Sequence, residues 1–586
     1  MRTLSPRLAR LMAVLLIILP VGMAMAQTRA GYTRTHDGLE RTYSLYVPDS
    51  VSASEPAPLV IALHTIAGSG GGMAAITGFN ALADEAGFIA AYPDSAGYVW
   101  DDGRNAAGLP PAGDLIDDTG FINAMIADIA TKYTLADDQI YLTGMGNGGV
   151  MAYRMACESP GTFAGIAVVG ALMWDYQAQP CQDSPAAPLD LLILRGSNDG
   201  YYPAEGRTLD SDGLSTRVWG LAETLDFWKA RNGCVETASE TGSAQEYACE
   251  SDRRLAVFTI EGGGNNWPRP GHSLNQYGVD TTRTIWRFFT GDTDWAQQPE
   301  ALVNQPDEAP RSFVLYVPHS YDPSAPTPLV IALHGRPGNG AGFALITDLN
   351  AVAEAHGFIV AYPDGVGQQW DYYYDILPDY SEAIDDVAFL RTLVNDLSLD
   401  LHIDSMRRYV TGFSNGGMMT HRMACQTSDV FAAFAPVGGT LPSDYGGICL
   451  DAPGTPIIMI HGTADVSIPW NGLVQQFNGR VYPVLLSVPD TINFWATHNG
   501  CDIDGYSFED LPQNNPATAV RQHNFINCTG GANVMVYSIA GGGHNWPGVD
   551  NDMIGAEIAG IVNTDINAGE VIWTFFAAHP KTSQSE

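Results

Sequence analysis

Basic residues are scarce in this chain of 586 residues: 28 lysines and arginines stand against 65 aspartates and glutamates, which gives a formal net charge of −37. The only lysines are Lys132, Lys229 and Lys581. A surface with such an excess of negative charge repels nucleic acids and anionic membranes. We therefore expect neither as a partner.

Long apolar runs are also missing beyond the N-terminus, so we expect no membrane-spanning helix in the mature chain. Residues 1–26 have the pattern of a secretory signal peptide. Basic residues precede an apolar run over 11–21, and residues 24–26 read Ala-Met-Ala, a small-x-small cleavage site. We expect the mature chain to begin at Gln27 and the protein to be secreted or periplasmic.

The 8 cysteines lack the CxxC spacing and the histidine partners of a metal site, so metal binding is disfavoured. Export permits disulfides instead. Pairing of neighbours is the simplest connectivity, although sequence alone does not prove it. The expected bonds are Cys157–Cys181, Cys234–Cys249, Cys425–Cys449 and Cys501–Cys528.

The same unit occurs twice in the chain. The run Leu-Val-Ile-Ala-Leu-His stands at 59–64 and again at 329–334. A chain of this length is also too long for one hydrophobic core. We expect two domains, at 27–291 and 311–580, joined by a polar, proline-bearing linker at 292–310.

Short apolar runs alternate with helical patterns in each copy. Runs that are apolar throughout and rich in β-branched residues are typical of parallel strands buried on both faces. Strands that alternate with helices indicate the α/β class. The sequence therefore predicts two tandem α/β domains, each built on a mostly parallel, doubly wound sheet.

A serine motif marks the second copy. Gly-Phe-Ser-Asn-Gly around Ser414 fits G-x-S-x-G, the tight strand-to-helix turn that exposes a nucleophile. A serine needs a base, and His544 in Gly-Gly-Gly-His-Asn-Trp-Pro is the candidate. The orienting carboxylate should lie between them in the chain, where Asp465 fits and Asp490 is the rival. His461 ends a strand, and we expect a structural role for it.

Two more pairs of residues complete the predicted site. The loop after the strand that ends at His334 is expected to supply an oxyanion N–H at Gly335, and Asn415 the other. Trp370, in an aromatic loop, and Trp546, beside the histidine, are predicted to contact the substrate. Ordinary packing is the alternative for the aromatic loop.

The first copy has lost this chemistry. Gly146 stands in place of the serine and Asn265 in place of the histidine, while Asp199 is retained. Thr65 replaces the glycine of the oxyanion loop. Without a nucleophile or a base, this copy is expected to be inactive.

An aspartate pair recurs in both copies, as Asp117-Asp118 and as Asp385-Asp386. The copy without a nucleophile keeps the pair, so chemistry does not explain it. We expect these residues to cap and pack helices.

The motifs LVIALHG, AYPDG, VTGFSNGGMM, HGTADVSIPWNG and GGGHNWPG span nearly the whole second copy. Jointly they resemble the secreted α/β-hydrolase esterases that include polyhydroxybutyrate depolymerases and feruloyl and acetylxylan esterases. The resemblance implies a triad of Ser414, Asp465 and His544 and an acyl-enzyme. It implies no cofactor or metal.

The resemblance leaves the substrate open. Feruloyl or acetyl esters on plant polysaccharide are the favoured interpretation, because no separate polymer-binding domain of the kind that polyester depolymerases add is evident. A polyhydroxybutyrate-type polyester is the alternative. The first copy is interpreted as a non-catalytic binding or structural module, and no obligate protein partner is indicated.

Overall fold

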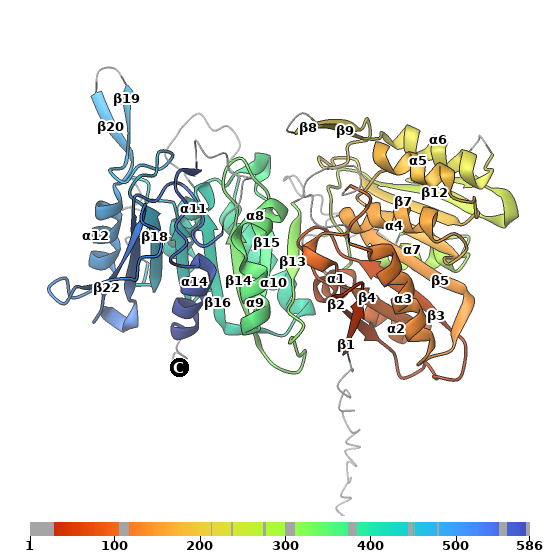
Figure 1. Cartoon of the computed structure of the whole chain (residues 1–586), viewed down its shortest axis with the longest axis horizontal. Helices are drawn as coiled ribbons and strands as arrows, with labels where there is room; N and C mark the ends of the chain where they lie inside the picture. Colours follow the sequence, from red (N-terminus) through yellow and green to blue (C-terminus); the bar gives the residue numbers. More distant parts are fainter. Residues whose placement is uncertain are drawn as a thin grey trace, which may run out of the picture.

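The computed structural model describes residues 29–104, 116–211, 214–235, 238–273, 277–298, 311–372, 384–443, 449, 452–477, 480–549 and 559–581. The predicted signal peptide and residues 299–310 of the predicted linker lie outside these ranges. Figure 1 shows two domains side by side, each with a central sheet between helices. None of the helices in the described ranges has both the length and the apolar character that a membrane crossing needs.

The sheet of the first domain has the strand order β1-β2-β4-β3-β5-β6-β7-β12-β11-β10. Pairing is parallel from β4 to β12 and antiparallel at both edges. The strands are β1 Arg29–His36, β2 Leu39–Tyr46, β3 Ala57–Leu63, β4 Ile89–Pro93, β5 Leu135–Met145, β6 Gly165–Val169, β7 Asp190–Gly196, β10 Ser239–Thr241, β11 Ala244–Ala248, β12 Arg254–Ile260, and a separate hairpin, β8 Arg207–Ser211 and β9 Leu214–Val218. The helices are α1 Gly70–Thr77, α2 Phe79–Ala86, α3 Asp118–Ala130, α4 Asn147–Glu158, α5 Asp175–Asp183, α6 Leu221–Asn232 and α7 Thr281–Phe289.

The second domain repeats this plan with the order β13-β15-β14-β16-β17-β18-β23-β22-β21. Pairing is parallel from β15 to β23. The strands are β13 Phe313–Tyr316, β14 Thr327–Leu333, β15 Ile359–Pro363, β16 Ile403–Phe413, β17 Ala433–Val437, β18 Ile457–Gly462, β21 Ser507–Asp510, β22 Ala519–Phe525, β23 Val534–Ala540, and a hairpin, β19 Leu473–Phe477 and β20 Arg480–Leu485. The helices are α8 Gly340–Thr347, α9 Leu349–His356, α10 Asp386–Asp400, α11 Asn415–Gln426, α12 Val488–His498 and α14 Ala568–Ala578.

The apolar run in β3 explains why helices cover both faces of the sheet. Leu59, Ile61 and Leu63 point to one face, where α3, α4 and α6 pack, while Val60 and Ala62 point to the other, with α2 and α7. Alternate side chains of a strand lie on opposite faces, so a continuous apolar run needs two cores. The predicted doubly wound α/β class is confirmed.

The predicted disulfides are present as two bonds in each domain. They join Cys157 to Cys181, Cys234 to Cys249, Cys425 to Cys449 and Cys501 to Cys528. Four disulfides fit a protein of an oxidising compartment.

The edge strand β13 is covered by the first domain. It occupies the place of β2, but β2 pairs with β1, whereas β13 has no outer strand among the described residues and faces α1 (Figure 1). A Cβ on Gly72 of α1 would lie 2.1 Å from the Leu315 carbonyl oxygen, so only glycine permits this approach. The Ser69 hydroxyl donates to the Val317 carbonyl and accepts from the Val317 N–H, both at 3.0 Å. The first domain thereby protects the exposed edge of the second sheet.

A charged contact also joins the domains. His319 Nε2 lies 2.9 Å from Asp94 Oδ2 of the first domain, and His319 Nδ1 lies 3.2 Å from Glu354 Oε1. The hydrogen bonds to Asp94 and Glu354 raise the pKa of His319 to about 10. The protonated ring therefore ties the two domains together at neutral pH.

His319→Gln is expected to reduce stability mainly at low and neutral pH. A pKa raised above the ordinary 6.5 means that the contacts stabilise fully below pH ~6.5 and lose this effect as the pH rises through about 10. With 39% of the side chain exposed, screening limits the effect to ~1 kcal/mol. The measurement is Tm from pH 6 to pH 10, with His356→Gln, which changes a ring that contacts Glu570 within the second domain, as control. An equal Tm difference at all pH values would contradict this assignment.

Candidate active site

Ser414 stands on a strained turn between β16 and α11. Its backbone has φ 57° and ψ −118°, a conformation that L residues rarely adopt. A Cβ on Gly412 would lie 2.4 Å from the Gly416 carbonyl oxygen, and one on Gly416 would lie 2.2 Å from the Leu333 carbonyl oxygen. Both glycines are therefore required for the turn, which presents the half-buried serine at the C-terminal end of the parallel strands.

His544 bridges Ser414 and Asp465. Its Nε2 lies 2.9 Å from Ser414 Oγ, and its Nδ1 lies 2.7 Å from Asp465 Oδ2. Because a carboxylate only accepts, Nδ1 carries the proton, and Nε2 is free to accept from the serine hydroxyl. The structure thus brings the three predicted residues together in the arrangement of a serine nucleophile, its base and an orienting acid.

Asp465 is fixed by backbone donors. Its Oδ1 accepts from the N–H groups of Ser467 and Ile468, both at 2.8 Å, and the residue is 5% exposed. This leaves Oδ2 for the imidazole of His544. The rival Asp490 lies exposed at the start of α12, where its Oδ2 accepts from the Ser487 hydroxyl at 2.6 Å.

His461 has the structural place that its position in the sequence suggested. Its Nε2 lies 2.8 Å from the Ile468 carbonyl oxygen and 3.5 Å from Asp465 Oδ2. Burial lowers the pKa of His461, so the ring stays neutral beside the acid. His461 therefore supports the turn that carries Asp465. None of its described hydrogen bonds is to Ser414.

The predicted oxyanion residues flank the serine. A Cβ on Gly335 would lie 3.3 Å from Ser414 Cβ, so the loop after β14 passes directly beside the serine. Asn415 is the first residue of α11, where backbone N–H groups have no partner within the helix. His334 fixes the loop, since its Nδ1 lies 2.8 Å from the Gly335 carbonyl oxygen and its Nε2 accepts from the Gly365 N–H at 2.9 Å.

The substrate contacts predicted for Trp370 and Trp546 need correction, because both rings lie in the core. Trp370 is 2% exposed, and its indole N–H donates to the His334 carbonyl oxygen at 3.1 Å. Trp546 is 1% exposed and packs edge-on against Phe343 at 5.5 Å. The two buried rings therefore support the chain segments that carry Gly335 and His544. The sequence already contained this information, because the first copy, which lacks the serine and the histidine, keeps both tryptophans, at 100 and 267.

An apolar cluster that the sequence analysis missed lies beside the triad. Met418, Ile468 and Leu485 are buried together, with Tyr372 and Val484 packed against them. Met418 is one turn along α11 from the serine, and Ile468 closes the turn of the acid. These residues come from three distant segments, so no local pattern in the sequence joins them.

The first domain keeps the backbone of the turn without its chemistry. Gly146 has φ 54° and ψ −120°, nearly the same as Ser414. Asn265 Nδ2 donates to Asp199 Oδ2 at 2.9 Å and to the Gly170 carbonyl oxygen at 2.7 Å. The asparagine therefore fills the place of the histidine as a donor to the acid, but an amide cannot serve as a base near neutral pH.

Thr65 obstructs the same place. A Cβ on Gly146 would lie 2.6 Å from Thr65 Oγ1, where the second domain has Gly335. A serine side chain at position 146 would collide with Thr65. The glycine at 146 and the threonine at 65 therefore fit each other sterically.

No group of three or more histidine, cysteine, aspartate or glutamate side chains in the described ranges is placed to hold a metal ion. The triad itself needs none, because its proton transfers run through the imidazole.

One protein family matches both domains. The family described as Esterase PHB depolymerase matches residues 41–180 and 311–446. Feruloyl esterase B of Piromyces equi is 30% identical over 240 residues, which are 40% of this chain and 42% of that protein. Feruloyl esterase C of Emericella nidulans is 32% identical over 176 residues, which are 29% of this chain and 60% of that protein. The chain thus spans less than two thirds of the length of these relatives.

Among solved structures, an acetyl xylan esterase from Aspergillus awamori is 18% identical and has a TM-score of 0.32, over 41% of this chain and 96% of that chain. The segment 311–446 contains Ser414 and the oxyanion loop, and the segment 41–180 contains the corresponding positions of the first domain. Both domains of the chain are therefore similar to the family described as Esterase PHB depolymerase.

Proposed function

We propose that the second domain is a serine carboxylic-ester hydrolase that works through an acyl-enzyme. The observation that carries the proposal is the placement of His544 between Ser414 Oγ and Asp465 Oδ2, at 2.9 Å and 2.7 Å. The family and the names of the relatives, which are esterases, support it.

The mechanism uses this chain's own groups. Ser414 Oγ attacks the ester carbonyl carbon while His544 Nε2 takes the hydroxyl proton. The N–H groups of Asn415 and of the loop at Gly335 hold the oxyanion, where one donor is worth ~3 kcal/mol in the transition state. The imidazolium, stabilised by Asp465, gives the proton to the leaving alcohol. Water then attacks the acyl-enzyme by the same route and releases the acid and the free serine.

For the natural substrate we propose feruloyl or acetyl esters of plant polysaccharide. The feruloyl esterases among the relatives support this class. The apolar cluster of Met418, Ile468 and Leu485 beside the triad suits an apolar acyl or alkoxy group. The description of the family favours a second candidate, a polyhydroxybutyrate-type polyester.

A hydrolysis panel separates these substrates. The full chain is assayed with methyl ferulate, acetylated xylan and polyhydroxybutyrate, at equal concentrations of titrated active sites. Hydrolysis of methyl ferulate or acetylated xylan in preference to the polyester is the expected result. Release of hydroxybutyrate as the fastest reaction would replace the substrate assignment, and inertness toward all esters would overturn the proposed activity.

The first domain is proposed to be non-catalytic, in a protein that is secreted or periplasmic. The replacement of the nucleophile and of the base by Gly146 and Asn265 supports the first part. The four disulfides support the second.

Gly146→Ser in the full chain is expected to destabilise the first domain by ~2 kcal/mol without creating activity. The new Cβ takes a strained backbone conformation and meets Thr65 Oγ1 at 2.6 Å. Thr65→Ala in the same chain removes the contact and should restore part of the loss, which makes the two effects non-additive. Denaturant unfolding measures the cycle, and hydrolysis in a Ser414→Ala background measures activity. Additive stability effects, or turnover by the single variant, would contradict the account of this site.

A further inference from the structure

The second domain closes over the degenerate site of the first. A cavity of about 80 Å³ beside Gly146 has walls from both domains. The residues that matter below are Thr65, Gly146 and Tyr201 of the first domain and Ser312, Phe313 and Asp364 of the second. The place where a substrate would enter an active copy is therefore used as a contact surface.

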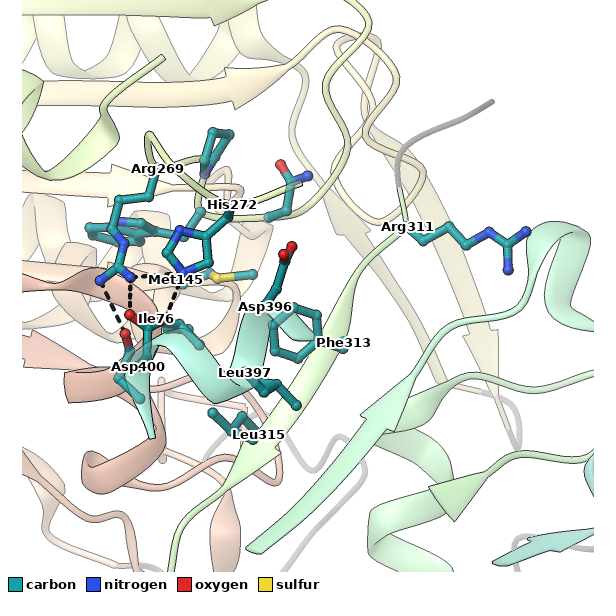
Figure 2. A pocket seen from close by; sticks show the side chains of 14 residues that line it. Ile76, Met145, Arg269, His272, Arg311, Phe313, Leu315, Asp396, Leu397 and Asp400 are labelled. Carbon is teal, nitrogen blue, oxygen red and sulfur yellow. Dashed lines mark hydrogen bonds and ion pairs between the residues drawn. The ribbon is translucent and has the colours of Figure 1, made fainter. Parts of the chain in front are cut away.

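This contact surface extends from the degenerate turn to α10. Figure 2 shows a second cavity at the interface, where Arg269 and His272 of the first domain meet Asp400 at the end of α10. His272 Nε2 lies 2.7 Å from Asp400 Oδ2, and the Arg269 guanidinium pairs with the same carboxylate. Met145, which directly precedes Gly146, shares this cavity with Phe313 of β13. The first domain thus holds both the edge strand and a helix of the second.

Tyr201 links this contact surface to the oxyanion loop. Its hydroxyl lies 3.5 Å from Asp364 Oδ2, which also accepts from the Ser312 hydroxyl. Asp364 Oδ1 accepts from the Gly340 N–H at 2.6 Å, at the start of α8. The next residue, Gly365, donates to His334 Nε2 at 2.9 Å. The segment that carries Gly335 is therefore fixed at both of its ends by residues 364 and 365.

The hydrogen-bond donors to Asp364 oppose the effect of burial on its pKa. Burial raises the pKa of Asp364 above its ordinary value, and the hydrogen bonds from Ser312 and Gly340, the nearby His334 ring and the Tyr201 hydroxyl offset this only in part. A carboxylate accepts all three bonds more strongly than a protonated carboxyl, in which one oxygen becomes a donor. The Tyr201 hydroxyl thus favours the form of Asp364 that holds the loop.

The degenerate site in turn holds Tyr201. Asp199 Oδ1 accepts from the backbone N–H of Tyr201 at 2.8 Å, and Asp199 Oδ2 accepts from Asn265 Nδ2 at 2.9 Å. The corresponding turn of the second domain has the small Ser467 at this place, bonded in the same way to Asp465. Of the two corresponding turns, the one that contacts the other domain carries the large side chain, Tyr201. Holding this side chain is the role that we assign to the retained Asp199.

We propose that the degenerate site of the first domain has become a docking surface that positions the oxyanion loop of the second, with Tyr201 as a positioning residue that acts through Asp364. The proposal rests on the proposed esterase function. It explains why the catalytic acid of the first copy survives although its nucleophile and base do not.

The test compares full-length variants at equal concentrations of titrated active sites. Tyr201→Phe removes only the hydroxyl and is expected to lower kcat for nitrophenyl acetate about threefold to tenfold, with KM within about twofold. Binding of a trifluoromethyl ketone, which forms a tetrahedral adduct at the serine, should weaken by a similar factor. Tyr46→Phe is the matched control, because that hydroxyl also donates to a carboxylate, Asp84 at 2.7 Å, but within the first domain. It should leave all three values unchanged.

A second comparison tests the route through Asp364. In an Asp364→Asn background, Tyr201→Phe is expected to have no further effect, because the acceptor is already changed. Unchanged kcat in Tyr201→Phe, an effect on KM alone, or additive effects of the two changes would each overturn the proposal. None of these results depends on the identity of the nucleophile, which Ser414→Ala tests separately.

Discussion

Ser414→Ala is expected to lower the rate of ester hydrolysis about 10⁶-fold while the fold stays intact. In the proposed mechanism Ser414 Oγ is the attacking atom, and its hydrogen-bond partner is His544, which is bonded in turn to Asp465. A methyl group cannot replace it, and water held by the same imidazole attacks far more slowly. The remaining rate over the uncatalysed reaction comes from the oxyanion donors and substrate binding.

The control for this variant is Ser398→Ala, which removes a hydroxyl that donates to the Val394 carbonyl oxygen within α10. It should retain full activity. Rates are measured with nitrophenyl acetate, and circular dichroism and Tm verify the fold. Activity of Ser414→Ala within tenfold of the wild type would mean that another serine, or the first domain, performs the chemistry.

Asp465→Asn is expected to lower kcat about 10⁴-fold, although the substitution hardly changes the shape of the side chain. Oδ1 accepts from two backbone N–H groups, so the amide oxygen of an asparagine takes this place and its NH₂ group turns toward His544. The ring nitrogen Nδ1 must then accept, which places the imidazole proton on Nε2. In that tautomer the ring cannot take the proton of Ser414.

Asp490→Asn is the matched control for this change, because Asp490 is the other carboxylate in the correct interval of the chain. It lies exposed on α12, and a loss of its charge should leave kcat unchanged. The reverse result, with Asp490→Asn impaired and Asp465→Asn active, would show that the acid has been assigned to the wrong residue.

The candidate catalytic residues and the strands that position them could be predicted from the sequence. A continuous apolar run must be buried on both faces, and a glycine-flanked serine after such a run has few other uses. The recurring aspartates also behave as predicted: Asp117 accepts from the Gly120 N–H at 2.7 Å and Asp385 from the Ala388 N–H at 2.9 Å, each at a helix start. These features depend on neighbours along the chain, and local patterns report them.

The features that the sequence did not reveal depend on residues far apart in the chain. Trp370 looks like an exposed aromatic in a loop, but a carbonyl group of the distant β14 loop binds its indole N–H. The contact between Tyr201 and Asp364 joins residues of different domains. The site around Gly146 keeps most of the motifs of an esterase site, so the sequence indicates only decay where we propose a docking surface.

In the mechanism proposed above, one nucleophile, Ser414, serves the whole chain. The most direct test is reaction of the full-length protein with a fluorophosphonate, followed by the intact mass and peptide mapping. We expect one adduct per chain, on Ser414, loss of activity in proportion to labelling, and no adduct in Ser414→Ala. An adduct on a serine of the first domain, or labelling of Ser414→Ala at the wild-type rate, would contradict it.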